Sequence, residues 1–186
     1  MEVLRRIDAA RREINATIMM FLNDYDAVAT HTVAAAGLQI VSDLAEKDGK
    51  SAGVNWMMEA IIPEKQKELL AMFRAPQNFF KHADHPGNEA DTLEYRPESL
   101  ESYIMLACLG YHECTGMYTP EMRAFMLWVG IYAPQIFMDS AHKSGIEEYI
   151  KNSSDTTPAQ HKQTLIGTIK MMREQQPRTL EDTDYS

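Results

Sequence analysis

The sequence has few cysteines and no long apolar run. Exported proteins often rely on cysteines for disulfides, and membrane proteins need a long apolar run to span the bilayer. Its 186 residues contain only Cys108 and Cys114, six positions apart, so their side chains point to different sides of a helix and no disulfide is expected. Charged side chains interrupt the first 22 residues at nearly every turn, and no stretch of about 18 apolar residues occurs. We therefore expect a cytoplasmic protein that makes no membrane contact.

The sequence also lacks the motifs that identify common enzyme classes. It has no phosphate-binding glycine loop, no dinucleotide fingerprint, no nucleophile elbow and no paired-histidine metal helix. A formal charge of −9 would repel a phosphate backbone at long range, which disfavours broad binding to nucleic acid. The basic residues near the N-terminus alternate with acidic ones, which favours ion pairs such as that of Asp8 with Arg5 over a nucleic-acid patch.

The residues that are present indicate a helical domain with a substantial core. Hydrophobic residues make up 45% of the chain and charged residues 24%, the proportions of an ordinary globular protein. Apolar residues recur at steps of three and four in most segments, which predicts amphipathic helices. We predict an all-α, single-domain bundle of six or seven helices over residues 1–176, followed by a disordered acidic tail over residues 177–186.

One helix is expected to be central in the bundle and another to be buried. Asp26 is placed to cap a helix from Ala27 to about Lys47, in which residues 32–37 read TVAAAG. Because a run of small side chains lets another backbone approach closely, this helix should be central. Residues 125–137 are apolar on nearly all sides, which predicts a buried helix that kinks before Pro134.

Prolines and capping residues set the other expected boundaries. Pro63 should begin a helix that Pro76 breaks, because proline removes a backbone donor and clashes with the preceding turn. Residues 82–91 should form a loop, and residues 93–95 a short extended strand. The remaining helices are expected over about 2–22, 99–115, from 120 onward, 145–152, and 158 to about 174.

One polar and aromatic segment holds the candidate catalytic residues. Residues 77–85 read QNFFKHADH. If residues 77–82 begin a helical turn, Asn78 and His82 share a face at a spacing of four, while the two phenylalanines between them anchor the segment in the core. A histidine held in this way can act as a general acid or base near neutral pH, and Lys81 can stabilise a developing negative charge.

Other interpretations of these histidines stay open. Asn78 can instead cap or bridge the backbone while His82 makes a structural hydrogen bond. His82, Asp84 and His85 carry suitable ligands for zinc or iron, but a further ligand is needed and the Glu-x-x-His pattern of di-iron bundles is missing, so we expect no metal or other cofactor. His31 is expected to be a satisfied, partly buried histidine; its alternative role is as a partner for His82 in a cleft.

Several segments resemble a family of uncharacterised bacterial all-helical proteins. They include the HTVAAA run at residues 31–36, the NFFKHAD run at residues 78–84, and the residues numbered 94–98 and 125–137. The resemblance implies a shared fold and brings no known activity with it.

The NFFKH part of this segment is also similar, more weakly, to HEPN domains. These are helical bundles whose ribonuclease members carry an arginine, a following polar residue and, after three more positions, a histidine. Asn78 and His82 match the polar residue and the histidine, whereas Gln77 stands where the arginine should be and Arg74 lies one helical turn too early. The resemblance implies a metal-independent ribonuclease or RNA-binding protein of a bacterial or phage stress or defence system, with Lys81 in a supporting role.

A non-enzymatic function is the alternative. The missing arginine, the charge of −9 and the absence of a complete catalytic motif are consistent with a helical module that binds another protein in assembly or regulation.

The apolar face of residues 2–22 and the apolar helix after Pro120 need more cover than a chain of this size readily supplies. We therefore expect a twofold homodimer.

Overall fold

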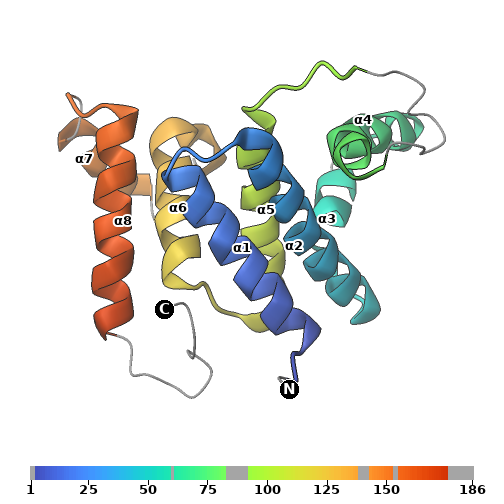
Figure 1. The fold of residues 1–186 in the computed structure, drawn as a ribbon, viewed down its shortest axis with the longest axis horizontal. Coiled ribbons are helices and arrows are strands. Elements are labelled where there is room, and N and C mark those ends of the chain that lie inside the picture. The colour runs from blue at the N-terminus through green and yellow to red at the C-terminus, as the bar shows by residue number, and fades with distance from the viewer. Residues whose placement is uncertain (1–2, 60, 83–91, 138–142, 153–154, 176–186) are drawn as a thin grey trace. The chain divides into compact units, whose positions relative to one another are not determined.

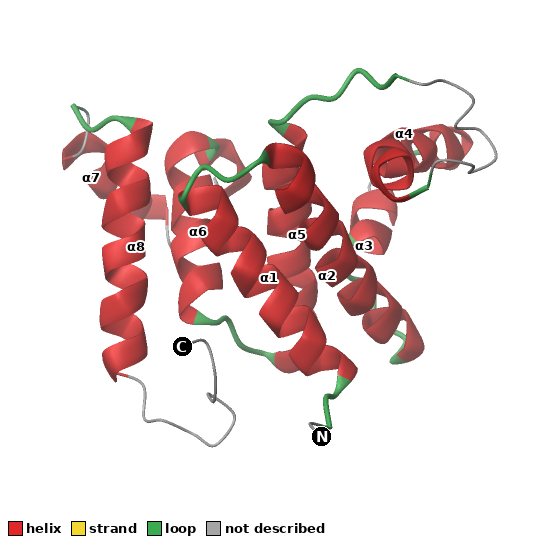
Figure 2. Ribbon diagram, in the orientation of Figure 1, coloured by secondary structure: helices red, strands yellow, loops and turns green. Residues whose placement is uncertain are grey.

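The computed structural model describes residues 3–59, 61–82, 92–137, 143–152 and 155–175. Over these ranges the regular structure consists of eight α-helices and one short 3₁₀ helix with no strand, which confirms the all-α fold class (Figure 2). No helix in the described ranges is long and apolar enough to cross a membrane. The predicted acidic tail from residue 177 lies outside the described residues.

Contacts divide the chain into two compact units, residues 1–122 and 123–186. The extent of the single domain predicted over residues 1–176 stays a prediction. The helices of the first unit are α1 (Arg6–Leu22), α2 (Ala27–Lys47), α3 (Val54–Glu59), α4 (Pro63–Lys81) and α5 (Ser99–Thr115). Those that follow are α6 (Pro120–Tyr132), which begins in the first unit, η1 (Pro134–Phe137), α7 (Lys143–Asn152) and α8 (Pro158–Gln175).

The helix α2 is central in the first unit, as predicted. It contacts α1, α3, α4 and α5, and Figure 1 shows α1, α2 and α5 side by side. Glycines permit these close approaches: a Cβ atom added at Gly37 of α2 would lie 3.0 Å from Ile14 Cγ1, and one added at Gly110 of α5 would lie 2.6 Å from Val41 Cγ2. A Cβ atom at Gly110 would force Val41 to shift, and one at Gly37 would require Ile14 to give way by a few tenths of an ångström.

Local signals place three helix ends where they were predicted. The Asp26 carboxylate accepts a hydrogen bond of 2.9 Å from the amide of Ala29 at the start of α2. Gly116 ends α5 with a φ of 73°, a conformation that glycine adopts without steric cost. At the start of α8, Thr157 and Gln160 cap each other's backbone amides, at 2.8 and 3.3 Å.

The predicted break at Pro76 is wrong, because α4 continues through this proline to Lys81. Pro76 cannot donate to the carbonyl of Met72. The next carbonyl, that of Phe73, accepts a hydrogen bond from the Tyr103 hydroxyl of α5. The Phe73 and Tyr103 rings also stack with their centroids 4.1 Å apart. Contacts from α5 therefore support α4 on the N-terminal side of the proline and outweigh its local preference.

Two expectations about the ends of helices also need correction. The first helix begins at Arg6 rather than near residue 2, and Val3 is 90% exposed, so this part of the chain has no core to pack against. The sixth helix does not kink and continue: it ends at Tyr132, and a separate 3₁₀ helix begins at Pro134, which cannot donate to the preceding turn. Tyr132 is 40% exposed, so the predicted burial holds for only part of this helix.

The predicted strand is wrong, and so is the predicted number of six or seven helices, because the described residues form eight α-helices. Residues 93–95 form a loop, and the described part of the chain offers no second strand with which they could pair. Pro63 occupies the first turn of α4, as predicted, and so separates α3 from α4. The side chain of Gln66 joins the two by donating to the carbonyls of Met58 and Ile61, at 3.1 and 3.0 Å.

In the second unit, α6 and α8 meet through an aromatic contact. The Tyr132 hydroxyl lies 2.7 Å from Nδ1 of the buried His161, and the rings of Trp128 and Tyr132 lie 4.2 Å apart. The Lys162 Nζ atom lies 5.4 Å from the centre of the Trp128 ring, within the range of a cation–π interaction. These contacts serve the packing of the unit and include none of the predicted site residues.

Candidate functional site

The predicted site segment lies at the end of a helix rather than at the start of one. Asn78 belongs to the last turn of α4, and His82 follows the helix, with its amide donating to the Asn78 carbonyl at 3.0 Å. Asn78 is half-buried, whereas Lys81 and His82 are exposed. The spacing of four is therefore present, and the carbonyl end of the helix is a favourable place for the Lys81 cation.

The phenylalanines of this segment differ in their contacts. The ring centroid of Phe80 lies 5.6 Å from that of His31 and 5.1 Å from that of Tyr95, which anchors the end of α4 on the bundle as predicted. Phe79 meets the Phe80 ring edge-on at 6.2 Å. Both phenylalanines are only half-buried.

Three cations lie in a row along one face of α4. Lys67, Arg74 and Lys81 are seven residues apart, close to two helical turns, so successive members lie about 10 Å from each other. All three are exposed, and among the described residues none forms an ion pair. Lys65 points to a different side of the helix and pairs with Glu68 at 2.8 Å. We call Lys67, Arg74 and Lys81 the cation row.

Sequence reasoning missed the cation row because the expected break at Pro76 separated its members. The seven-residue spacing was visible in the sequence, but it places side chains together only if one helix spans all three positions. Because α4 is continuous, Arg74 precedes Asn78 by one turn and lies on the same face. A guanidinium group therefore accompanies the Asn78–His82 segment, although not from position 77.

His31 is more deeply buried than predicted, and only one of its ring nitrogens is satisfied. The residue is 0% exposed. Its Nδ1 lies 3.3 Å from the Tyr95 hydroxyl, which in turn donates to the carbonyl of Ala27 at 3.3 Å. Its Nε2 has no hydrogen-bond partner among the described residues. Because the Tyr95 proton goes to Ala27, we assign the imidazole proton to Nδ1, which leaves Nε2 as an unused acceptor.

Three aromatic rings enclose His31. The centroids of Phe80, Tyr95 and Tyr103 lie 5.6, 5.5 and 4.1 Å from the centroid of the imidazole. We call these three rings the aromatic cage. Burial, with a smaller effect from the charge of Lys81, lowers the pKa of His31 from 6.5 to about 4. His31 is therefore neutral at pH 7.

The structure does not join the two predicted histidines. No hydrogen bond or ring contact between His31 and His82 occurs in the described residues, and His31 is enclosed by the cage while His82 is exposed. Sequence reasoning did not find Tyr95 and Tyr103 as the neighbours of His31. They lie 64 and 72 positions away in the chain, and no local pattern connects residues so distant.

Metal and thiol chemistry receive little support from the described residues. Asp84 and His85 lie outside them, and within them no group of three or more potential ligands is arranged to hold a metal ion. Cys108 and Cys114 are free thiols, and burial raises the pKa of both, which disfavours the reactive thiolate.

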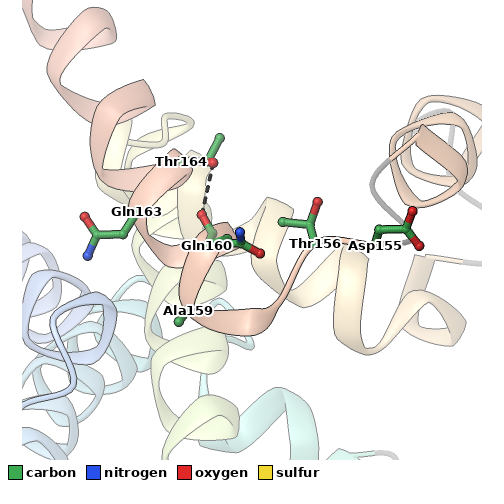
Figure 3. A pocket seen from close by; sticks show the side chains of 6 residues that line it. All are labelled: Asp155, Thr156, Ala159, Gln160, Gln163 and Thr164. Carbon is green, nitrogen blue, oxygen red and sulfur yellow. Dashed lines mark hydrogen bonds between the residues drawn. The ribbon is translucent and has the colours of Figure 1, made fainter.

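Two surface hollows lie away from these residues. One, of about 610 Å³, is formed by the start of α8 and the residues before it (Figure 3). The side chain of Gln160, which lines this hollow, already accepts a hydrogen bond from the amide of Thr157. The other, of about 520 Å³, is lined mostly by polar residues between Glu46 and Gln66, together with Gly49 and Met58. Neither hollow includes His31, Asn78, Lys81 or His82.

Comparison with known proteins adds no further assignment. No family model matches the sequence, and no curated protein or solved structure matches it either. The resemblances to bacterial helical proteins and to HEPN domains therefore stay predictions.

Proposed function

We propose that the chain binds RNA along α4 and cleaves it beside His82 without a metal ion. The observation that carries the proposal is the continuity of α4 through Pro76, which puts Arg74, Asn78 and Lys81 on one face with His82 at its end. A basic face of this kind is the usual electrostatic footprint of a nucleic-acid site.

The chemistry requires only groups that RNA and two copies of this segment would supply. The RNA 2′-oxygen attacks the neighbouring phosphorus, its proton passes to a base, and the 5′-oxygen leaves with a proton to give a 2′,3′-cyclic phosphate. The exposed imidazole of His82 is suited to be the base. Lys81 and Arg74 would stabilise the charge on the phosphate oxygens, and the Asn78 amide would orient them.

The predicted homodimer would supply the acid for this reaction. A single His82 can take the proton from the 2′-oxygen but cannot at once give another to the leaving oxygen. A twofold dimer with its α4 ends together would bring a second His82, with the opposite protonation state, to the same phosphate. Light scattering tests the dimer, since a mass near 21.2 kDa would indicate a single chain.

The cleavage test compares two exposed histidines. Purified protein in excess EDTA should cleave single-stranded RNA to cyclic phosphate products, and His82→Ala should reduce the rate at least 100-fold, since loss of an acid–base group typically costs 10²–10⁴. His112→Ala is the matched control, because His112 is also exposed and stacks on Tyr118 at 4.4 Å. Equal rates for the His82 variant and the unmodified protein would reject the proposal.

A non-enzymatic module that binds a protein is the second candidate, and exposed apolar side chains on α3, on α4 and at the residue before α4 favour it. Trp56, Ile62 and Met72 are 54%, 64% and 65% exposed, and exposed large apolar residues can form part of an interface. Capture of one specific protein that is lost with Trp56→Ser and Met72→Ser, together with no RNA turnover, would support this function over the first.

A further inference from the structure

The helix α4 contacts the rest of the first unit through two aromatic residues, Phe73 and Phe80. None of its 19 residues, all of which the structure describes, is fully buried. Phe73 stacks on Tyr103, and Phe80 contacts both His31 and Tyr95. A helix attached by a few half-buried rings can separate from its neighbours at a lower cost than one in the core.

The imidazole under this helix cannot take up a proton without disturbing the cage. Protonation would turn Nε2 from an unused acceptor into a donor, and the described residues offer it no acceptor. A buried charge that lacks a partner is strongly unfavourable, whereas the same imidazolium is well solvated in water.

The groups that face His31 do not supply a compensating charge. From α4 the charged neighbour is Lys81, a cation, which opposes protonation. Tyr95 and Tyr103 stay uncharged because burial raises the pKa of both. Glu13 of α1 is harder to ionise, because burial raises its pKa. The charges of Asp26 and Glu98 raise the pKa of Tyr95, in addition to the larger effect of burial. Attraction between an imidazolium and the ring faces is weaker than the cost of burying the charge.

We propose that His31 is a proton-sensitive latch: when it is neutral the aromatic cage is closed and α4 is docked, and when it is protonated α4 is released. Release would move Arg74, Asn78 and Lys81 together with the helix. Only the consequence for RNA rests on the proposed function, since the release itself involves this chain alone.

The size and sign of the pH effect on α4 release follow from the pKa of His31 in the closed and open states. The pKa is about 4 in the closed state, and it returns to 6.5 when the imidazole is exposed to water. The open state therefore binds more protons between these values. Lowering the pH from 7 to 5 shifts the equilibrium about 20-fold towards release, and raising the pH reverses it.

Amide hydrogen exchange of the full-length protein tests the latch without RNA. After correction for the intrinsic pH dependence of exchange, the protection of α4 should fall about 20-fold between pH 7 and pH 5. His31→Phe, which keeps a ring but cannot be protonated, should remove this change. His112→Gln, at an exposed histidine, should retain it.

Titration of the His31 imidazole by NMR in the unmodified protein decides the matter if His31→Phe does not fold. The latch requires His31 to titrate well below 6.5, together with the loss of α4 protection. Titration near 6.5 with α4 still protected would overturn the proposal, as would the same loss of protection in His31→Phe. If acid releases α4 but His82→Ala cleaves RNA normally, the latch stands and the proposed function fails.

Discussion

The helices α2 and α4 have similar lengths, but they use opposite ways of packing. The first has 21 residues, of which nine are buried. Gly37 of α2 lets α1 come close, and Gly110 of α5 lets that helix come close to Val41. The second has 19 residues and buries none completely, because it rests on the bundle through large rings. Close packing surrounds α2 with its neighbours, whereas α4 keeps many of its polar side chains at the surface.

The largest expected effect lies at the contacts of α2. Gly110→Ala should lower the free energy of unfolding by about 2 to 3 kcal/mol, because the new Cβ atom would lie 2.6 Å from Val41 Cγ2 and the helices must separate. Urea unfolding followed by circular dichroism measures the change.

Gly167→Ala of α8 is the matched control for this substitution. No atom lies within 4 Å of a Cβ atom added at Gly167, so alanine should be neutral or should stabilise the helix by up to about 1 kcal/mol. If the two variants unfold at the same urea concentration, the account of close packing around α2 is wrong.

A smaller effect is expected where α4 meets the bundle. Phe80→Ala should cost about 2 kcal/mol, because it removes a half-buried ring from the aromatic cage, and it should raise the exchange of α4 amides more than that of α1 or α5. Met72→Ala is the control on the same helix, since Met72 is 65% exposed and its loss should change stability by less than about 0.5 kcal/mol. Uniform loss of protection in all helices would contradict a separately held α4.

The contrast between α2 and α4 also explains which features the sequence could predict. The ends of α2 follow from Asp26 and Asp48-Gly49, and its central place follows from the TVAAAG run, because both are local properties of the chain. Continuity of α4 through Pro76 depends instead on Tyr103, a residue 27 positions later. A rule based on neighbouring residues cannot include that contact.

The same reason limits what could be predicted of the site. The Asn78–His82 spacing is a local pattern and is present as predicted. The burial of His31 depends on rings from α4, from the residues before α5 and from α5 itself. The sequence marked His31 as a residue of interest but could not show that its Nε2 would be buried without a hydrogen-bond partner among the described residues.

The smallest expected effect concerns the cation row. Lys67→Gln combined with Arg74→Gln should weaken the binding of single-stranded RNA about tenfold and lower the slope of log affinity against log salt concentration by about 1.4, near 0.7 for each lost phosphate contact. Lys65→Gln, at a lysine paired with Glu68, should change neither value appreciably. Fluorescence anisotropy over a series of salt concentrations would show whether the two lysines differ.

The division of roles between the two helices is tested most directly by NMR of the full-length, isotope-labelled protein titrated with a short single-stranded RNA in EDTA. The account predicts amide shifts that concentrate in α4 and at His82, with residues 34–45 of α2 unchanged. Shifts confined to other helices, or no shifts at RNA concentrations well above that of the protein, would contradict it.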